Sequence, residues 1–233
     1  GTIADNIAIG SKALLNSNAG NNNIGIGNRT LYSILAGYRN VALGTDALYN
    51  LSGNDNTAIG DSALKEIRIA HRNTAVGSKA LQNTGGDDNV GIGFKAVSYF
   101  GGTGNVAIGA HTLHDASGDF NVAAGDSSLY YAAPYAQNVA IGAKALLGVL
   151  GIGRTVGGRN TAVGFKSLYA NNEGFNNVAV GHGTLAANEF GNANIAIGNA
   201  ALGRNVNASG SLAIGDSALY GQNSNVQNLA IGV

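Results

Sequence analysis

The chain has 233 residues, of which 11% are charged and 45% are hydrophobic, and its 13 basic residues balance its 13 acidic ones. Low charge together with this hydrophobic content does not suit a disordered chain, although 37 residues are glycine. The lack of cysteine excludes disulfides and thiol chemistry, and it is compatible with an extracellular protein.

One short phrase recurs along the whole chain: an Asn, an apolar residue, a small residue, an aliphatic residue and a Gly. It first appears at Asn6–Gly10 and last at Asn228–Gly232, fourteen times in all, with Ser211 replacing Asn once. The spacing is 16 or 17 residues, except for 22 between Asn138 and Asn160. A fixed period this short indicates a solenoid, in which each coil buries its apolar side chains only by stacking on its neighbours.

Each coil contains two short apolar segments. In the first, Val106 and Ile108 alternate with Ala107, which is typical of a strand with one buried face. We expect Val106, Ile108 and Leu113, the aliphatic residue of the second segment, to supply the apolar side chains of their coil. A Gly precedes the repeated Asn by three residues in nine of the thirteen linkers, as at Gly53. Because Gly and Asn tolerate positive φ, each coil is predicted to contain two turns.

These features predict an all-β protein, a parallel β-solenoid or β-roll with two short strands and two turns in each of about fourteen coils. Residues 1–233 form a single repeat domain in this interpretation, with an irregular longer coil at 138–160. The recurring Asn side chains are expected to form a structural ladder along one edge of the coils. The ladder residues are Asn6, Asn23, Asn40, Asn56, Asn73, Asn89, Asn105, Asn121, Asn138, Asn160, Asn177, Asn194 and Asn228.

The repeated phrase resembles known fibrous proteins. The sequences of 105–109 and 194–198 resemble the NSVAIG core of YadA-like head repeats from trimeric autotransporter adhesins. The longer units at 56–64 and 73–81 are similar to the NTAIGxxAL repeats of phage tail fibres and related bacterial tail-fibre-domain proteins. This resemblance covers the whole chain and implies a left-handed β-roll, a side-by-side homotrimer and an extracellular or virion-surface location.

The thin core also favours a trimer. Each coil offers about four apolar side chains, and their burial at roughly 25 cal/mol per Å² barely offsets the entropy lost by ordering the coil. Packing against other copies would bury a second face of each coil.

Two surface positions repeat. The second residue after the Gly is basic in six coils and forms a predicted line of positive charge, which either prevents aggregation or binds an anionic surface glycan. A Tyr follows the Leu in five coils, where it either packs between protomers or stacks on sugars. The candidate ligand contacts are Lys12, Arg29, Lys79, Lys95, Lys144, Lys166, Tyr32, Tyr49, Tyr130, Tyr169 and Tyr220.

The longest coil contains an apolar and flexible insertion, Leu147–Gly153. Insertions in solenoids form loops on one face, often the binding face. This one is predicted either to contact a ligand or to fill a trimer interface.

The acidic and histidine residues give little reason to expect catalysis. Asp61, Asp126 and Asp216 share one coil position but stand four and five coils apart, which is roughly 19 to 24 Å at the strand spacing. Glycosidic cleavage requires two carboxylates within about 5 to 10 Å. The neighbours Asp87 and Asp88 are interpreted as a solvated turn pair. The histidines, His71, His111, His114 and His182, show no metal-ligand spacing beyond the His111–His114 pair.

Three classes of function remain: a fibre or adhesin segment, a tailspike-type carbohydrate hydrolase or lyase, and an ice-binding solenoid. The hydrolase lacks a clustered acid and base, and the ice-binding protein lacks a regular Thr array. We therefore expect a non-enzymatic segment of a longer fibre, with a bacterial trimeric autotransporter adhesin head as the alternative. It would need no cofactor or metal, and its partners would be its own copies and a cell-surface glycan or other receptor. We expect no nucleic-acid partner and no membrane insertion by this segment.

Overall fold

The computed structural model describes residues 5–17, 20–34, 36–66, 69–83, 85–99, 102–115, 118–131, 137–148, 157–222 and 227–232. Over these residues the chain contains strands and turns and no helix, so none of them provides an apolar helix long enough to cross a membrane. The chain divides into two compact units, Gly1–His114 and Asp115–Val233.

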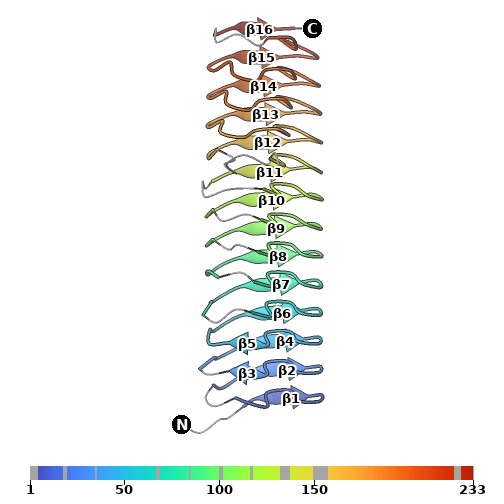
Figure 1. Ribbon diagram of the computed structural model, residues 1–233, viewed down its shortest axis with the longest axis vertical. Coiled ribbons are helices and arrows are strands. Elements are labelled where there is room, and N and C mark those ends of the chain that lie inside the picture. Colours follow the sequence, from blue (N-terminus) through green and yellow to red (C-terminus); the bar gives the residue numbers. More distant parts are fainter. Residues whose placement is uncertain are drawn as a thin grey trace. The chain divides into compact units, whose positions relative to one another are not determined.

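In the first unit, strands of successive coils pair in parallel and in register, so that Thr57 lies beside Thr74 (Figure 1). The order of its main sheet is β1-β2-β4-β6-β7-β8-β9, while β3 and β5 pair separately. The strands are β1 (Ile7–Ile9), β2 (Ile24–Ile26), β3 (Ser33–Ile34), β4 (Val41–Leu43), β5 (Asn50–Leu51), β6 (Thr57–Ile59), β7 (Thr74–Val76), β8 (Val90–Ile92) and β9 (Val106–Ile108).

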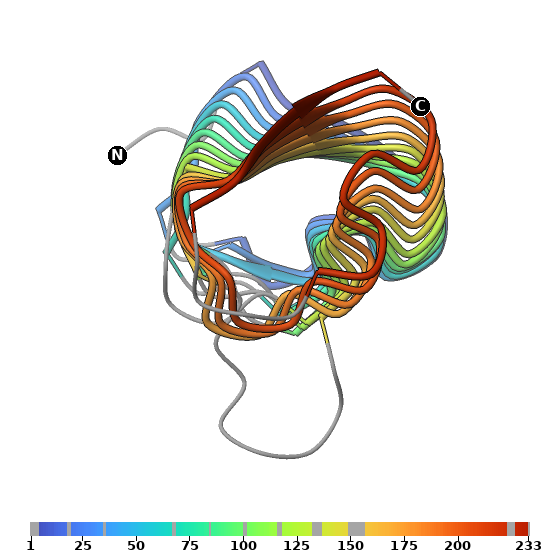
Figure 2. The same cartoon turned by 90° about the horizontal axis from the view of Figure 1, so that it is seen from above.

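The second unit repeats this arrangement with the order β10-β11-β12-β13-β14-β15-β16. The longest coil keeps the register, because Val139 of β11 pairs with Thr161 of β12. The strands are β10 (Val122–Ala124), β11 (Val139–Ile141), β12 (Thr161–Val163), β13 (Val178–Val180), β14 (Ile195–Ile197), β15 (Leu212–Ile214) and β16 (Leu229–Ile231). Viewed along the stack, the strands of each unit superpose on one side of the coil (Figure 2). The predicted all-β parallel β-solenoid is confirmed.

The buried face of the strands is the opposite of the one expected. Ala107 in the middle of β9 has no exposed surface, whereas Val106 is half-buried and Ile108 is 46% exposed. The same holds at Ala42, Ala58 and other central residues of the strands. The alternation was read correctly, but the prediction that Val106 and Ile108 point into the coil is wrong.

The physical reason is the narrow interior of the coil. The buried Leu of the second segment already fills the space beneath the sheet, so the strand can contribute only a small side chain there. Where Gly replaces the central Ala, an added Cβ would lie 3.0 Å from Thr30 Oγ1 at Gly25 and 3.0 Å from Leu81 Cγ at Gly91. A β-branched residue at this position would overpack the core, so the larger aliphatic residues point outward.

The second apolar segment is mainly a turn rather than the expected second strand, and only β3 and β5 form a ladder of their own. Its Leu adopts positive φ, for example 49° at Leu48 and 51° at Leu81. A non-glycine residue in this region costs about 1 to 2 kcal/mol. The turn turns each Leu into the core and still bonds to the next coil, since the Leu48 N–H donates to the Ala63 carbonyl at 3.0 Å.

The corners also differ from the prediction. Positive φ falls on the residue before the repeated Asn, such as Asp55 at 61° and Arg72 at 57°, and the repeated Asn itself does not adopt it. At Gly53 the requirement is close approach, because an added Cβ would collide with the Ala70 carbonyl oxygen. Both corners are therefore tight, but for different reasons.

The inward position of the central Ala predicts that a larger side chain is tolerated only on the outward side. Ala75→Leu should lower the free energy of unfolding by about 1 to 3 kcal/mol through overpacking against Leu81. Val76→Leu, one residue further along β7 on the outward face, is the matched control and should change it by less. Urea titration followed by circular dichroism measures both, and equal effects would contradict the assigned faces.

Candidate functional site

The repeated Asn side chains form a buried column of hydrogen bonds in each unit. The Oδ1 atom of each Asn accepts the backbone N–H of the Asn in the next coil, at 3.0 Å from Asn73 to Asn56 and 2.9 Å from Asn194 to Asn177. The column is almost wholly shielded from solvent, except that Asn6 and Asn228 are only half-buried.

The amide nitrogen of the same side chains satisfies a second group. Asn73 Nδ2 donates to the Gly86 carbonyl at 3.0 Å, and Asn194 Nδ2 donates to the Ala208 carbonyl at 2.8 Å. Each side chain therefore joins its own coil to the next at a corner where the backbone ladder is interrupted. Buried amides bound on both sides present no free group to a ligand, so the geometry is that of a structural ladder.

A second buried ladder in the second unit was missed by the sequence analysis. Asn188 Nδ2 donates to Asn171 Oδ1 at 2.7 Å, and Asn205 Nδ2 points to Asn188 Oδ1 at 3.5 Å. All three side chains are fully buried. Their spacing of 17 residues is visible in the sequence and could have identified them.

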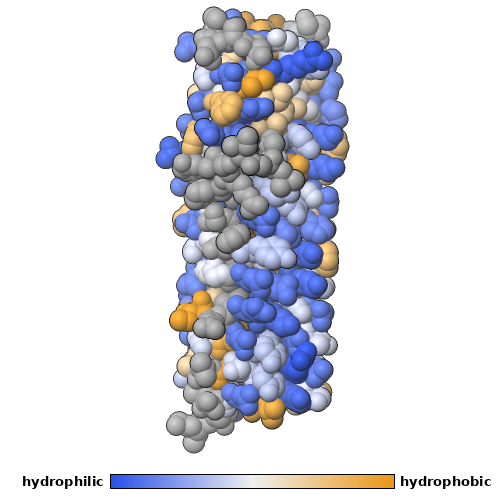
Figure 3. Space-filling model, in the orientation of Figure 1, coloured by the Kyte–Doolittle hydropathy of each residue, from blue (hydrophilic) through white to orange (hydrophobic). Residues whose placement is uncertain are grey.

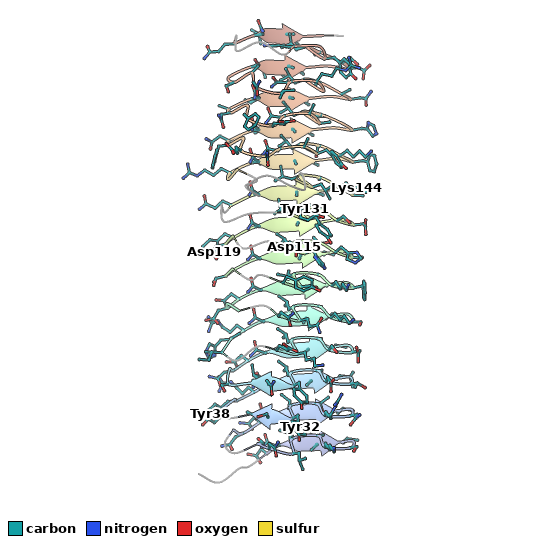
Figure 4. The ribbon with its side chains drawn as sticks, in the orientation of Figure 1. Tyr32, Tyr38, Asp115, Asp119, Tyr131 and Lys144 are labelled. Atoms are coloured by element: carbon teal, nitrogen blue, oxygen red, sulfur yellow. The ribbon has the colours of Figure 1, made fainter. Side chains whose placement is uncertain are left out.

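The corner before the strands of the first unit is held by polar side chains. The His71 Nδ1 atom accepts the Asn54 backbone N–H at 3.1 Å, and the His71 N–H donates to Asp87 Oδ1 at 2.8 Å. Tyr38 lies at this corner, whereas Lys144 in the second unit lies at the corner after its strand (Figure 4). His71 is thus a backbone acceptor, and the solvated pair Asp87 and Asp88 belongs to this charged corner.

Two exposed ion pairs connect coils at the same corner. Arg39 binds Asp55 at 2.6 Å, and Arg72 binds Asp88 at 2.6 Å and Asp87 at 3.4 Å. The guanidinium hydrogen bonds hold the pKa of Asp55 and of Asp88 below their usual range, against a smaller opposing effect of desolvation. A depressed folded-state pKa adds stability above the unfolded pKa, and this stability is lost as the pH falls through the folded value. The contribution is small because all four side chains are exposed and screened.

The predicted basic line is a real position in the coil but is not uniformly positive. Lys79 and Lys95 occupy consecutive coils, since the Lys95 N–H donates to the Ser78 carbonyl at 3.1 Å. Lys144 and Lys166 are consecutive in the second unit in the same way. Lys12 is exposed at the same position of the first described coil.

Arg29 departs from the line because the next coil places an acid beside it. Arg29 Nη2 lies 2.8 Å from Asp46 Oδ2, and Lys65 Nζ lies 3.2 Å from the same oxygen. Asp46 is buried and the two cations cover it. Arg29 is therefore partly neutralised, which the sequence analysis missed because Asp46 stands at the same coil position.

The tyrosines of the second predicted line contact each other and neighbouring cations. Tyr32 and Tyr49 stack with ring centroids 4.9 Å apart and planes 2° apart, and both are half-buried. Tyr130 packs on Tyr131, and Arg204 lies over the Tyr220 ring at 5.3 Å. Where two rings stack on each other, the faces between them are covered, so a sugar could reach only their outer faces and edges.

Two exposed aromatic clusters lie just after strands β8 and β12. Phe94 is 44% exposed, with Lys95 Nζ 5.4 Å from its ring centroid and the His111 ring at 5.3 Å. Phe165 is 43% exposed, with Lys166 Nζ at 5.3 Å and the His182 ring at 5.4 Å. Lys166 also lies 5.5 Å from the Tyr169 ring. The repeated Phe-Lys dipeptide was present in the sequence but was not singled out.

The outward face of each main sheet is aliphatic, since the first and third residues of its strands are Ile, Val, Leu, Thr or Ala. Ile9, Leu43 and Ile108 are between 44% and 57% exposed in the first unit, and Ile141 and Ile197 are about 40% exposed in the second. Seven strands at roughly 4.8 Å and three residues per strand give each unit a strip on the order of 300 Å². The view in Figure 3, by contrast, shows mainly hydrophilic side chains with scattered hydrophobic ones in each unit.

The acidic positions offer no assembled catalytic pair among the residues that the structure describes. Asp126 follows β10 and Asp216 follows β15, so four strands separate their coils, and Asp61 belongs to the other unit. Asp126 and Asp61 each accept a hydrogen bond from the following Ser. Among the described residues, no three His, Asp or Glu side chains meet in a group that could hold a metal ion.

The predicted insertion at Leu147–Gly153 lies largely outside the described residues, which resume at 157 after 148. Comparison of the chain with protein-family models, with curated proteins and with solved structures gives no match.

The ladder geometry predicts the effect of removing one amide. Asn194→Ala deletes the acceptor of the Ser211 N–H and the donor to the Ala208 carbonyl. Leaving these buried groups unsatisfied should lower the free energy of unfolding by about 1 to 3 kcal/mol. Thermal melting measures the loss. Asn192→Ala, at the exposed corner, is the control with a smaller expected effect; an Asn194→Ala variant that melts like the parent would contradict a structural ladder.

Proposed function

We propose that this chain is a non-enzymatic structural segment of an extracellular fibre or adhesin. In this proposal three copies pack side by side into a rigid rod that attaches to a cell surface. Each copy is a left-handed β-roll of about fourteen coils, as the resemblance to tail-fibre repeats implies. Its surroundings would be the virion surface or the cell exterior, and its partners would be its own copies and a surface receptor.

The observation that carries the proposal is the outward aliphatic face of the sheet. Soluble monomers rarely expose continuous apolar patches larger than a few hundred Å², and a patch of this size typically marks an interaction surface. Each unit presents such a strip, with Ile59 and Ile92 near 39% exposed in the first and Ile195 and Ile197 near 40% in the second.

A second copy is the partner that best fits this face. The strip has the periodicity of the coils, so an identical strip offers the same spacing of side chains along its whole length. A flat parallel sheet with no charged residue in its strands also has little to recognise in a polar ligand. Burial between copies would supply the apolar contact that the Ala and Leu core of one coil lacks.

Attachment is favoured over catalysis by the distribution of charge. Basic side chains at one corner and exposed rings beside them form recurring contacts along each unit, as at Lys79 and Lys95. The acidic groups are dispersed or bound to Arg, as Asp88 is to Arg72. A rod that displays many weak contacts gains strength through multivalency without any single deep site.

The assembly proposal makes a direct prediction. A charge placed in the outward face, Ile59→Glu, should convert the trimer into monomers because three carboxylates would be desolvated together. The control Asn50→Glu adds the same charge at an exposed residue of β5 and should remain trimeric. Sedimentation equilibrium measures the mass of each variant. A folded parent that sediments as a monomer would overturn the trimer.

Attachment without turnover is tested separately. Labelled protein should bind to intact cells in a panel of bacterial strains, and binding should weaken steeply as salt rises, because the contacts are partly electrostatic. Prolonged incubation with purified capsule or lipopolysaccharide from the bound strains should release no new reducing ends. Chain cleavage would indicate a glycan-cleaving enzyme, and failure to bind any strain at low salt would contradict attachment.

A further inference from the structure

The two exposed Phe-Lys-His clusters share one construction. In each, Phe and Lys follow the Gly that ends a strand, Gly93 in one and Gly164 in the other. The Lys has positive φ of 54° in both, and its ammonium lies 5.3 to 5.4 Å from the Phe centroid. A His ring from the following coil contacts the same Phe, at 5.3 and 5.4 Å. One cluster lies in each unit.

The Phe residues are exceptions at their coil position. Other coils place small or polar residues there, such as Ser78, Asp126 and Ala143. A Phe left more than 40% exposed does not contribute fully to a core, and its ring is held between a cation and an imidazole from two different coils. An exposed ring with fixed polar neighbours is a common construction for binding amphipathic ligands.

We propose that these clusters, Phe94-Lys95-His111 and Phe165-Lys166-His182, are two equivalent binding sites for a saccharide that carries a carboxylate. The apolar C–H face of a pyranose ring packs on the exposed part of the Phe ring. The sugar carboxylate pairs with the Lys ammonium held beside that ring, and the imidazole forms hydrogen bonds with hydroxyl groups. The inference rests on the proposed attachment function and names its ligand class.

The chain contains its own comparison for charge alone. Lys79 and Lys144 occupy the same coil position as Lys95 and Lys166 and are adjacent to them along each stack, but the residues before them are Ser78 and Ala143. A simple polyanion would interact with all four cations. A saccharide that needs the ring would depend on Lys95 and Lys166 and not on Lys79 and Lys144.

The test uses hyaluronan and polysialic acid as carboxylated saccharides, neutral dextran as the uncharged polysaccharide and polyglutamate as a carboxylated polymer without sugar rings. Surface plasmon resonance at low salt measures the affinity of the trimeric protein. At least one carboxylated saccharide should bind, and neither dextran nor polyglutamate should bind as tightly. Both Phe94→Ala with Phe165→Ala and Lys95→Gln with Lys166→Gln should weaken binding by about tenfold or more.

Two matched controls separate the site from its surroundings. Phe190→Ala removes a Phe that is also 43% exposed but lies in a linker, and Lys79→Gln with Lys144→Gln removes the same charge without a neighbouring ring. Both controls should bind within about twofold of the parent. All variants should keep the parent's melting temperature and mass.

The inference is overturned if neither carboxylated saccharide binds, if polyglutamate binds equally well, or if the Phe variants bind unchanged. It is also overturned if the Phe variants dissociate the trimer, because the rings would then belong to the subunit interface. Parent protein that attaches to bacterial cells but binds neither saccharide contradicts only this inference. Parent protein that attaches to no cells contradicts the proposed function itself.

Discussion

The structure depends on hydrogen bonds that run from each coil to the next. A coil of 16 or 17 residues cannot satisfy its backbone groups internally, so strands, turns and corners donate along the stack, as Leu48 N–H does to the Ala63 carbonyl. Where the backbone cannot continue the pattern, a side chain replaces it, as Asn73 does between its neighbours. These bonds hold the coils in register and offset the cost of positive φ at Leu and at the corner residues.

Stacking at this distance makes the interior narrow, and the narrow interior determines what the surface carries. Only Ala or Gly fits beneath the sheet, because the Leu side chains already occupy the space. The β-branched residues that favour a strand must therefore face outward. An aliphatic strip on a solvent-facing sheet is consequently a direct result of the repeat, and it is the feature that most strongly favours association with other copies.

The period, the parallel strands and the Asn ladder could be predicted from the sequence, because each follows from spacing and residue type. The direction of the strand side chains could not, since Val106, Ala107 and Ile108 give the same alternation with either face inward. The turn at Leu48 was also unpredictable, because positive φ at Leu is favoured only by contacts with neighbouring coils. Cross-coil pairs such as Arg29 with Asp46, and Phe165 with His182, required the alignment of coils, although Asn171, Asn188 and Asn205 could have been found from their spacing.

The central claim is that the outward sheet face is covered by identical copies. Because the chain contains no cysteine, one introduced thiol carries one spin label. Ile197→Cys places a label on the outward face of β14, and Asn172→Cys places one in a linker of the same unit. Pulsed dipolar spectroscopy should give a narrow intermolecular distance for Ile197→Cys that is shorter than that for Asn172→Cys. Absence of dipolar coupling at Ile197→Cys, or a shorter distance at Asn172→Cys, would contradict the account.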